Sequence, residues 1–132
     1  MMSTDECLRL KLEAEPENVG VARGAVAELA EDFGMTEPAL GDVRTIVGEA
    51  CANVVRHAYP AGPGQFEVEA YRADGRFSIV IRDYGVGMQA RAEVGEPSMR
   101  LGLGLISMLS SHFEISGGSG GTEIRAQLPL PA

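Results

Sequence analysis

Lysine is almost absent from this chain: Lys11 is the only one, against ten arginines. A Walker A phosphate loop needs a lysine beside a glycine where a strand turns into a helix. Lys11 lies instead in a segment that alternates apolar and charged residues, so the sequence excludes this loop. A nucleoside triphosphate would have to be held mainly by backbone amides, helix ends, a metal ion or arginine.

Cysteine and histidine are also scarce, with two of each in 132 residues. Cys7 and Cys51 form no disulfide framework, and the cysteines and histidines lack the spacing of zinc ligands. We therefore expect free thiols in a reducing compartment. His57 is expected to pack and hydrogen-bond at a helix end, and no serine has the setting of a Ser-His-Asp nucleophile.

Positive charge and long apolar runs are lacking as well. The formal net charge of −8 argues against direct nucleic-acid binding, because neutralising phosphates needs a basic face. Without a run of eighteen apolar residues we expect no membrane span, and the acidic residues 1–6 do not resemble a signal peptide. The composition is typical of one folded domain over residues 1–132, which we expect in the cytoplasm.

The sequence does contain clearly patterned segments. Short apolar or alternating segments predict five strands, at residues 8–12, 66–71, 77–82, 113–115 and 122–128. Helical spacing predicts three helices, at residues 16–33, 37–58 and 102–111. Thr36 is a candidate cap for the second helix, and Asp74-Gly75 is typical of a hairpin turn. This order predicts an α+β fold, an α/β sandwich whose mixed, mostly antiparallel sheet carries helices on one face.

Glu49 and Asn53 lie one turn apart on the second predicted helix, on a polar stripe beside the apolar face. A carboxylate and an amide in this arrangement can orient a hydroxyl and offer a neutral oxygen to Mg²⁺, which takes few protein ligands. The same spacing, taken alone, also describes a solvated polar stripe.

Asp83 follows an apolar strand and is followed by Gly85 and Gly87. A carboxylate at this position accepts hydrogen bonds only, as recognition of an adenine amino group requires, and the glycines allow a flat ring to approach the backbone. An ordinary Asp-Gly turn is the alternative interpretation.

Two further glycine segments are candidates for nucleotide contacts. Gly102 and Gly104 precede Leu105 at the start of the third predicted helix, where unpaired amides favour phosphate. Ser107 stands where a third glycine would complete a Rossmann fingerprint, so that interpretation is disfavoured. Thr122, after Gly121, can place a hydroxyl near a purine.

In order and spacing, these segments resemble the N, G1, G2 and terminal Gly-Thr boxes of the GHKL ATPases, over residues 8–128. Within that superfamily the chain most resembles the bacterial anti-sigma factor serine/threonine-protein kinases of partner-switching systems. The short chain, the brief lid and the continuation Asn53-Val54-Val55-Arg56-His57-Ala58-Tyr59 carry this closer resemblance.

The resemblance implies a single histidine kinase-like ATPase domain that binds ATP with Mg²⁺. Glu49 would be the general base or hydroxyl-orienting group, and Asn53 the Mg²⁺ ligand. Asp83 would bind the adenine amino group, with Thr122 in support. The remaining implied contacts are the adenine pocket at Gly85 and Gly87 and the phosphate amides at Gly102, Gly104 and Leu105.

The resemblance also implies partners: a STAS-domain anti-sigma factor antagonist as phosphoryl acceptor, a sigma factor, and a second copy in a homodimer. Two alternatives stay open, an ATP-binding regulatory module without significant kinase activity and a partner-switching kinase with another target. Glu49 favours an enzyme, because nucleotide binding alone would need Asn53 and Asp83 but no base.

Overall fold

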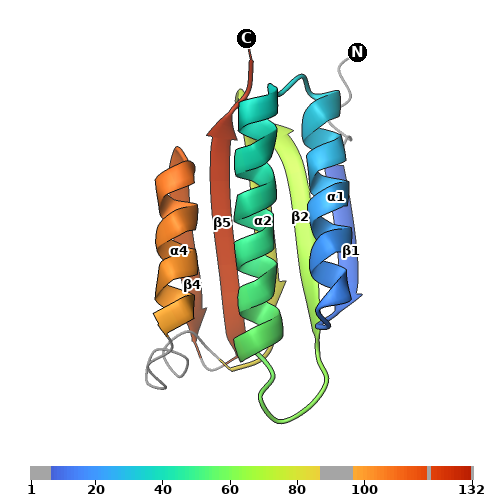
Figure 1. Ribbon diagram of the computed structural model, residues 1–132, viewed down its shortest axis with the longest axis vertical. Coiled ribbons are helices and arrows are strands. Elements are labelled where there is room, and N and C mark those ends of the chain that lie inside the picture. Colours follow the sequence, from blue (N-terminus) through green and yellow to red (C-terminus); the bar gives the residue numbers. More distant parts are fainter. Residues whose placement is uncertain (1–6, 87–96, 119, 132) are drawn as a thin grey trace.

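The computed structural model describes residues 7–86, 97–118 and 120–131, which form one sheet and one layer of helices (Figure 1). In chain order the elements are β1 (Cys7–Glu13), α1 (Glu17–Asp32), α2 (Glu37–His57), β2 (Gln65–Ala73), β3 (Arg76–Asp83), α4 (Pro97–Leu109), β4 (His112–Gly118) and β5 (Gly121–Pro129).

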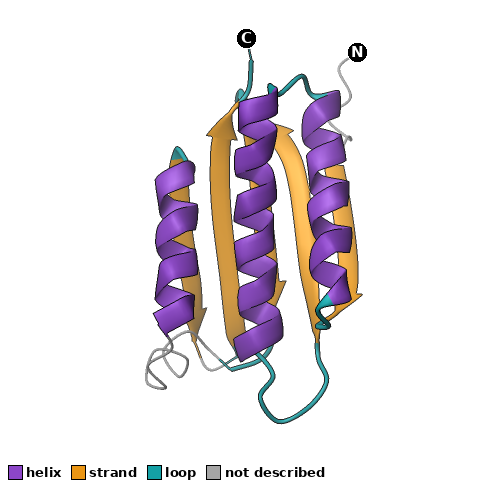
Figure 2. Cartoon of the chain, in the orientation of Figure 1, coloured by secondary structure: helices purple, strands orange, loops and turns teal. Residues whose placement is uncertain are grey.

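The five strands lie in the order β1-β2-β3-β5-β4, and every pairing among them is antiparallel. The C-terminal hairpin therefore inserts β5 beside β3 and leaves β4 at the edge. The three helices cover one face of the sheet, with α2 between α1 and α4 (Figure 2). This arrangement confirms the predicted α+β sandwich with its helices on one face.

The core lies between the two layers. Phe66, Ile79 and Ile81 of the sheet and Ile46 and Val47 of α2 are buried in one cluster. The buried apolar residues of α2 recur three or four positions apart, so they form one apolar stripe that faces the sheet. Burial of each such side chain contributes about 1.5–3 kcal/mol.

Local signals set most element bounds. The Thr36 hydroxyl caps α2 by accepting from the Ala39 N–H at 3.5 Å. Gly34, at φ +88°, follows the end of α1, and Asp74 and Gly75 turn the β2–β3 hairpin with φ values of +54° and +75°. These positive φ values explain why glycine or aspartate occupies the turns.

The third predicted helix needs a correction. Helix α4 begins at Pro97 and ends at Leu109, whereas the sequence predicted residues 102–111. Proline suits a helix start, and the glycines taken as the starting signal lie inside the helix. Gly102 lies inside the helix against α2, where a Cβ would require the Glu49 carboxylate to move.

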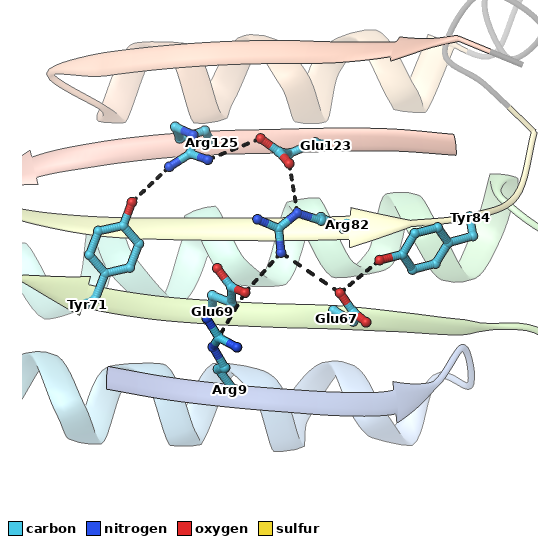
Figure 3. Close-up of polar contacts among 8 residues, drawn as sticks. All are labelled: Arg9, Glu67, Glu69, Tyr71, Arg82, Tyr84, Glu123 and Arg125. Carbon is cyan, nitrogen blue, oxygen red and sulfur yellow. Dashed lines mark hydrogen bonds and ion pairs between the residues drawn. The ribbon is translucent and has the colours of Figure 1, made fainter. Parts of the chain in front are cut away.

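The other face of the sheet is covered by its own polar side chains (Figure 3). Arg82 donates to Glu123 at 2.7 Å and to Glu69 at 3.0 Å, and these bonds raise the pKa of the Arg82 guanidinium. Ser78 and Val80, which alternate with the core residues of β3, are fully buried on this face. Long polar side chains therefore shield the sheet where no helix covers it.

Cys7 and Cys51 are free thiols, as predicted. Cys51 is fully buried in α2, and burial raises the pKa of its thiol to about 12, whereas Cys7 is exposed. Over the described ranges, no helix has both the length and the apolar character needed to cross a membrane.

Candidate functional site

The predicted site residues of the sheet meet where β3 ends and the β4–β5 hairpin turns. Asp83 and Thr122 are register partners across β3 and β5. Both are buried, with only 3% and 4% of their surfaces exposed. Alternation from the core residues Ile79 and Ile81 places Asp83 on the helix-covered face of the sheet. A carboxylate is thus held at the margin of the core.

The Asp83 carboxylate also shapes the chain that follows it. Its Oδ1 accepts a hydrogen bond from the Gly85 N–H at 3.1 Å. Burial of a carboxylate is costly unless hydrogen bonds support it. This local bond therefore orients the side chain at the end of β3, and a carboxylate, with about four lone-pair sites, can accept several hydrogen bonds at once.

Asn53 lies on α2 with 6% of its surface exposed. Neither its side-chain oxygen nor its side-chain nitrogen has a hydrogen-bond partner, and the Thr122 hydroxyl is likewise buried and unpartnered. Each such group costs about 1–3 kcal/mol when it is left unsatisfied. These groups suit a polar ligand that would satisfy them.

Close backbone approaches explain three glycines around Asp83. A Cβ at Gly85 would stand 1.9 Å from the Ala58 carbonyl oxygen, and one at Gly121 would stand 2.1 Å from the Asp83 carbonyl oxygen. A Cβ at Gly117 would stand 2.6 Å from the Gly121 oxygen. Any side chain at these positions would displace the backbone that carries Asp83 and Thr122. The predicted contact at Gly87 lies outside the described residues.

A cleft of about 280 Å³ opens beside Asp83 and Thr122. Its lining includes Gly117, Gly118 and Gly121, together with Arg82 and Glu123 from the face of the sheet away from the helices, whereas Glu49 and Asn53 of α2 do not line it. A concave site with a few convergent polar groups is the usual form of a small-molecule site.

Glu49 is half-buried on α2, one turn before Asn53, and faces α4. A Cβ added at Gly102 would stand 2.8 Å from its Oε1. The structure therefore brings together two residues that the sequence had placed in separate motifs. Gly102 and Gly104 lie inside α4 and Leu105 is exposed, so their contacts with phosphate stay a prediction.

A magnesium site made of side chains alone is not found among the residues that the structure describes, where no three His, Cys, Asp or Glu side chains group together. Mg²⁺ bound with a nucleotide takes most of its ligands from phosphates and water. The unpartnered Asn53 oxygen fits that mode of binding, since it is neutral, buried and lacks a partner.

Tyr59, for which the sequence predicts no role, lies beside the site, in hydrogen-bond contact with the residue that follows Asp83. Its hydroxyl accepts a hydrogen bond from the Tyr84 N–H at 2.9 Å and donates to the Gln65 carbonyl oxygen. The bond to Tyr84 joins residues 25 positions apart, and no local sequence pattern predicts it. The only signal was its place at the end of the Asn53 segment.

Comparisons with known proteins agree on the family. A family model described as the histidine kinase-like ATPase domain matches residues 12–128. The chain is 29% identical over 128 residues to a serine-protein kinase RsbW of Bacillus cereus strain AH820, covering 87% of this chain and 80% of the relative. An RsbW of Bacillus mycoides strain KBAB4 is 28% identical over the same shares.

Solved structures share the fold. The RsbU and RsbW domains of a Mycobacterium tuberculosis protein match with a TM-score of 0.76 and 24% identity, covering 96% of this chain and 33% of that one. A histidine kinase domain from Erythrobacter litoralis matches with a TM-score of 0.60 and 17% identity, over 87% of this chain and 60% of that one. The chain thus spans about a third of the first structure.

Proposed function

This chain belongs to the histidine kinase-like ATPase domain family, and we propose that it is an ATP-dependent serine/threonine-protein kinase that acts as an anti-sigma factor. The serine-protein kinase relatives cover most of its length and support kinase activity. The observation that carries the proposal is that the buried side chains of Asn53 on α2 and Thr122 on β5 have no hydrogen-bond partner among the residues that the structure describes.

In this proposal the nucleotide base binds at Asp83. The carboxylate accepts a hydrogen bond from the adenine amino group, and the Thr122 hydroxyl on the neighbouring strand supports the same ring. By the family resemblance, Gly85 and Gly87 shape the adenine pocket. The amides of Gly102, Gly104 and Leu105 contribute to phosphate binding, which requires the first part of α4 to open toward the nucleotide.

Glu49 and Asn53 act at the phosphate end. The Asn53 oxygen would hold Mg²⁺, which offsets the negative charge of the phosphates. The Glu49 carboxylate accepts the proton of an incoming serine or threonine hydroxyl. As the hydroxyl oxygen bonds to the γ-phosphorus, the bond from that phosphorus to the β–γ bridging oxygen breaks. ADP and a phosphorylated acceptor result, with the proton on Glu49.

The acceptor in this proposal is a STAS-domain anti-sigma factor antagonist. The same protein sequesters a sigma factor and forms a homodimer, and it works in the cytoplasm. These partners rest on the family resemblance of the motif segments.

Two alternatives compete with this function, an ATP-binding regulatory module that transfers phosphate poorly and a kinase with a target other than a sigma-factor system. The half-buried Glu49 one turn from Asn53 favours an enzyme over a binding module. It does not separate the two kinase alternatives.

A labelling experiment tests the proposal. The purified protein is incubated with γ-labelled ATP, Mg²⁺ and each STAS-domain protein of its host, and phosphoamino-acid analysis locates the label. We expect label on a serine or threonine of one STAS protein. Tight ATP binding without label on any of them would overturn the STAS-domain acceptor and leave the two alternatives, the binding module and a kinase with another target.

A further inference from the structure

The Tyr59 side chain links three segments around the predicted adenine site. Tyr59 follows the last residue of α2 by two positions. Its hydroxyl donates to the Gln65 carbonyl at the start of β2 and accepts from the Tyr84 N–H, immediately after β3. A phenol that donates and accepts at once is held in one orientation.

The aromatic ring of Tyr59 is fixed as firmly as its hydroxyl. A Cβ at Gly64 would stand 2.4 Å from three atoms of the ring, so the ring lies directly on the glycine. The Gly64 carbonyl in turn accepts from the Ala14 N–H at 2.8 Å, which ties this segment to the end of β1. Packing of the ring on Gly64 therefore fixes the position of the Tyr59 hydroxyl.

The same end of α2 holds the next residues after β3. The Ala58 carbonyl accepts from the Val86 N–H at 2.8 Å, and the Gly85 N–H donates to the Asp83 carboxylate at 3.1 Å. The amides of residues 84, 85 and 86 are thus all bonded, the first and last of them to residues that directly follow α2. The segment that shapes the Asp83 carboxylate is attached to the helix that carries Asn53 and Glu49.

We propose that Tyr59 is a positioning residue for the adenine site. Its hydroxyl holds the backbone after Asp83 and thereby sets the orientation of the carboxylate that receives the base. Tyr59 acts through Tyr84 and Gly85 and needs no contact with the nucleotide. The inference rests on the proposed function, in which Asp83 recognises adenine.

Tyr59→Phe removes the hydroxyl and keeps the ring on Gly64. Loss of one hydrogen bond predicts a rise of roughly 3- to 10-fold in the dissociation constant for ATP, measured by calorimetry. The affinity for AMP should weaken by the same factor, because the substitution affects the part of the site that binds adenine and not the part that binds phosphate. The KM for ATP should rise while kcat stays unchanged. In the nucleotide-free protein, hydrogen exchange of the Tyr84 amide should become faster.

A matched control is Tyr71→Phe, on the face of the sheet away from the helices. It also removes a phenolic hydroxyl, one that accepts from Arg125 at 2.8 Å. We expect its nucleotide affinities and Tyr84 exchange to equal those of the unmodified chain. Gly64→Ala is a second test, because it must displace the Tyr59 ring and should weaken ATP and AMP binding at least as much.

The outcomes separate this inference from the proposed function. An unmodified chain that binds no ATP would overturn both. An unmodified chain that binds ATP, with Tyr59→Phe binding ATP and AMP equally well, would overturn the role of Tyr59 alone. Equal weakening in Tyr59→Phe and Tyr71→Phe would also overturn it, since the loss would then reflect general stability.

Discussion

The Glu49 carboxylate on α2 lies against Gly102 on α4, where a Cβ would stand 2.8 Å from Oε1. The proposed base and the helix proposed to contact phosphate are therefore in direct contact. A side chain at position 102 would require the Glu49 carboxylate to move. A substitution in α4 is therefore expected to affect the proposed base on α2.

Replacing Asp83 tests recognition of adenine. Asp83→Asn exchanges one acceptor oxygen for a donor that would face the adenine amino group. Loss of a hydrogen bond to a charged group predicts ATP binding weakened roughly 10- to 150-fold, measured by calorimetry. Asp74→Asn is the control, because asparagine is tolerated at the positive φ of that exposed turn. Unchanged ATP affinity in Asp83→Asn would rule out the pocket assignment.

Replacing Glu49 separates binding from transfer. Glu49→Gln keeps the shape of the side chain and removes its ability to take a proton. Phosphate transfer should fall by roughly 10²- to 10⁴-fold, while the dissociation constant for ATP changes little. Glu28→Gln, at an exposed position on α1, should behave as the unmodified chain in both assays. A fully active Glu49→Gln enzyme would refute the role as base.

Removing magnesium tests the assignment of Asn53. EDTA should abolish phosphate transfer and added Mg²⁺ should restore it. Asn53→Ala should need a higher Mg²⁺ concentration for half-maximal transfer, because a protein ligand is lost. Asn18→Ala, which removes a side-chain hydrogen bond from α1 to the Glu13 carbonyl and changes no proposed metal ligand, is the control. Activity that persists in EDTA would count against a metal at Asn53.

Acid should weaken the polar network on the second face of the sheet. The hydrogen bond from Arg82 lowers the pKa of Glu123 below its ordinary value of 4.5. Because the pKa of this carboxyl is lower in the folded state than in the unfolded state, its charge stabilises the fold when the pH is above the pKa of the unfolded state. This stabilisation is lost as the pH falls through the pKa of the folded state. The contribution should be about 1 kcal/mol or less, since the two side chains are 27% and 30% exposed.

Thermal unfolding measures this effect. Between about pH 6 and about pH 3, the unmodified chain should lose more stability than Glu123→Gln does. Glu31→Gln, at an exposed position on α1, should keep the pH dependence of the unmodified chain. If Glu123→Gln and the unmodified chain lose stability in parallel, the Arg82–Glu123 pair contributes nothing.

Two glycine substitutions should have opposite effects. Gly85→Ala places a Cβ 1.9 Å from the Ala58 carbonyl oxygen, whereas Gly24→Ala in α1 meets nothing within 4 Å. The first should reduce the free energy of unfolding by roughly 1–3 kcal/mol and weaken ATP binding. The second should increase it by about 0.5–1 kcal/mol, because alanine favours a helix more than glycine does. Denaturant titration gives both values, and a stable Gly85→Ala variant would contradict the close approach.

Elements with strong local signals were predictable. Thr36 marks the start of α2 because its hydroxyl caps the first turn, and Asp74-Gly75 marks the β2–β3 turn because those residues adopt positive φ. The start of α4 was not predictable in the same way. Gly102 and Gly104 predict a helix start, but both lie inside α4, which begins at Pro97, and Gly102 packs there against the Glu49 carboxylate.

Periodicity along the chain already indicates which groups share a helix face or end a strand: Glu49 with Asn53, and Asp83 after an apolar run. Helical and strand periodicity is a local property of the backbone, so it can be read without a partner segment. In contrast, the insertion of β5 beside β3, which sets Thr122 opposite Asp83, and the hydrogen bond from the Tyr84 amide to Tyr59 follow from the folded arrangement alone. Such contacts join distant segments, and they depend on how the whole sheet and its helices pack.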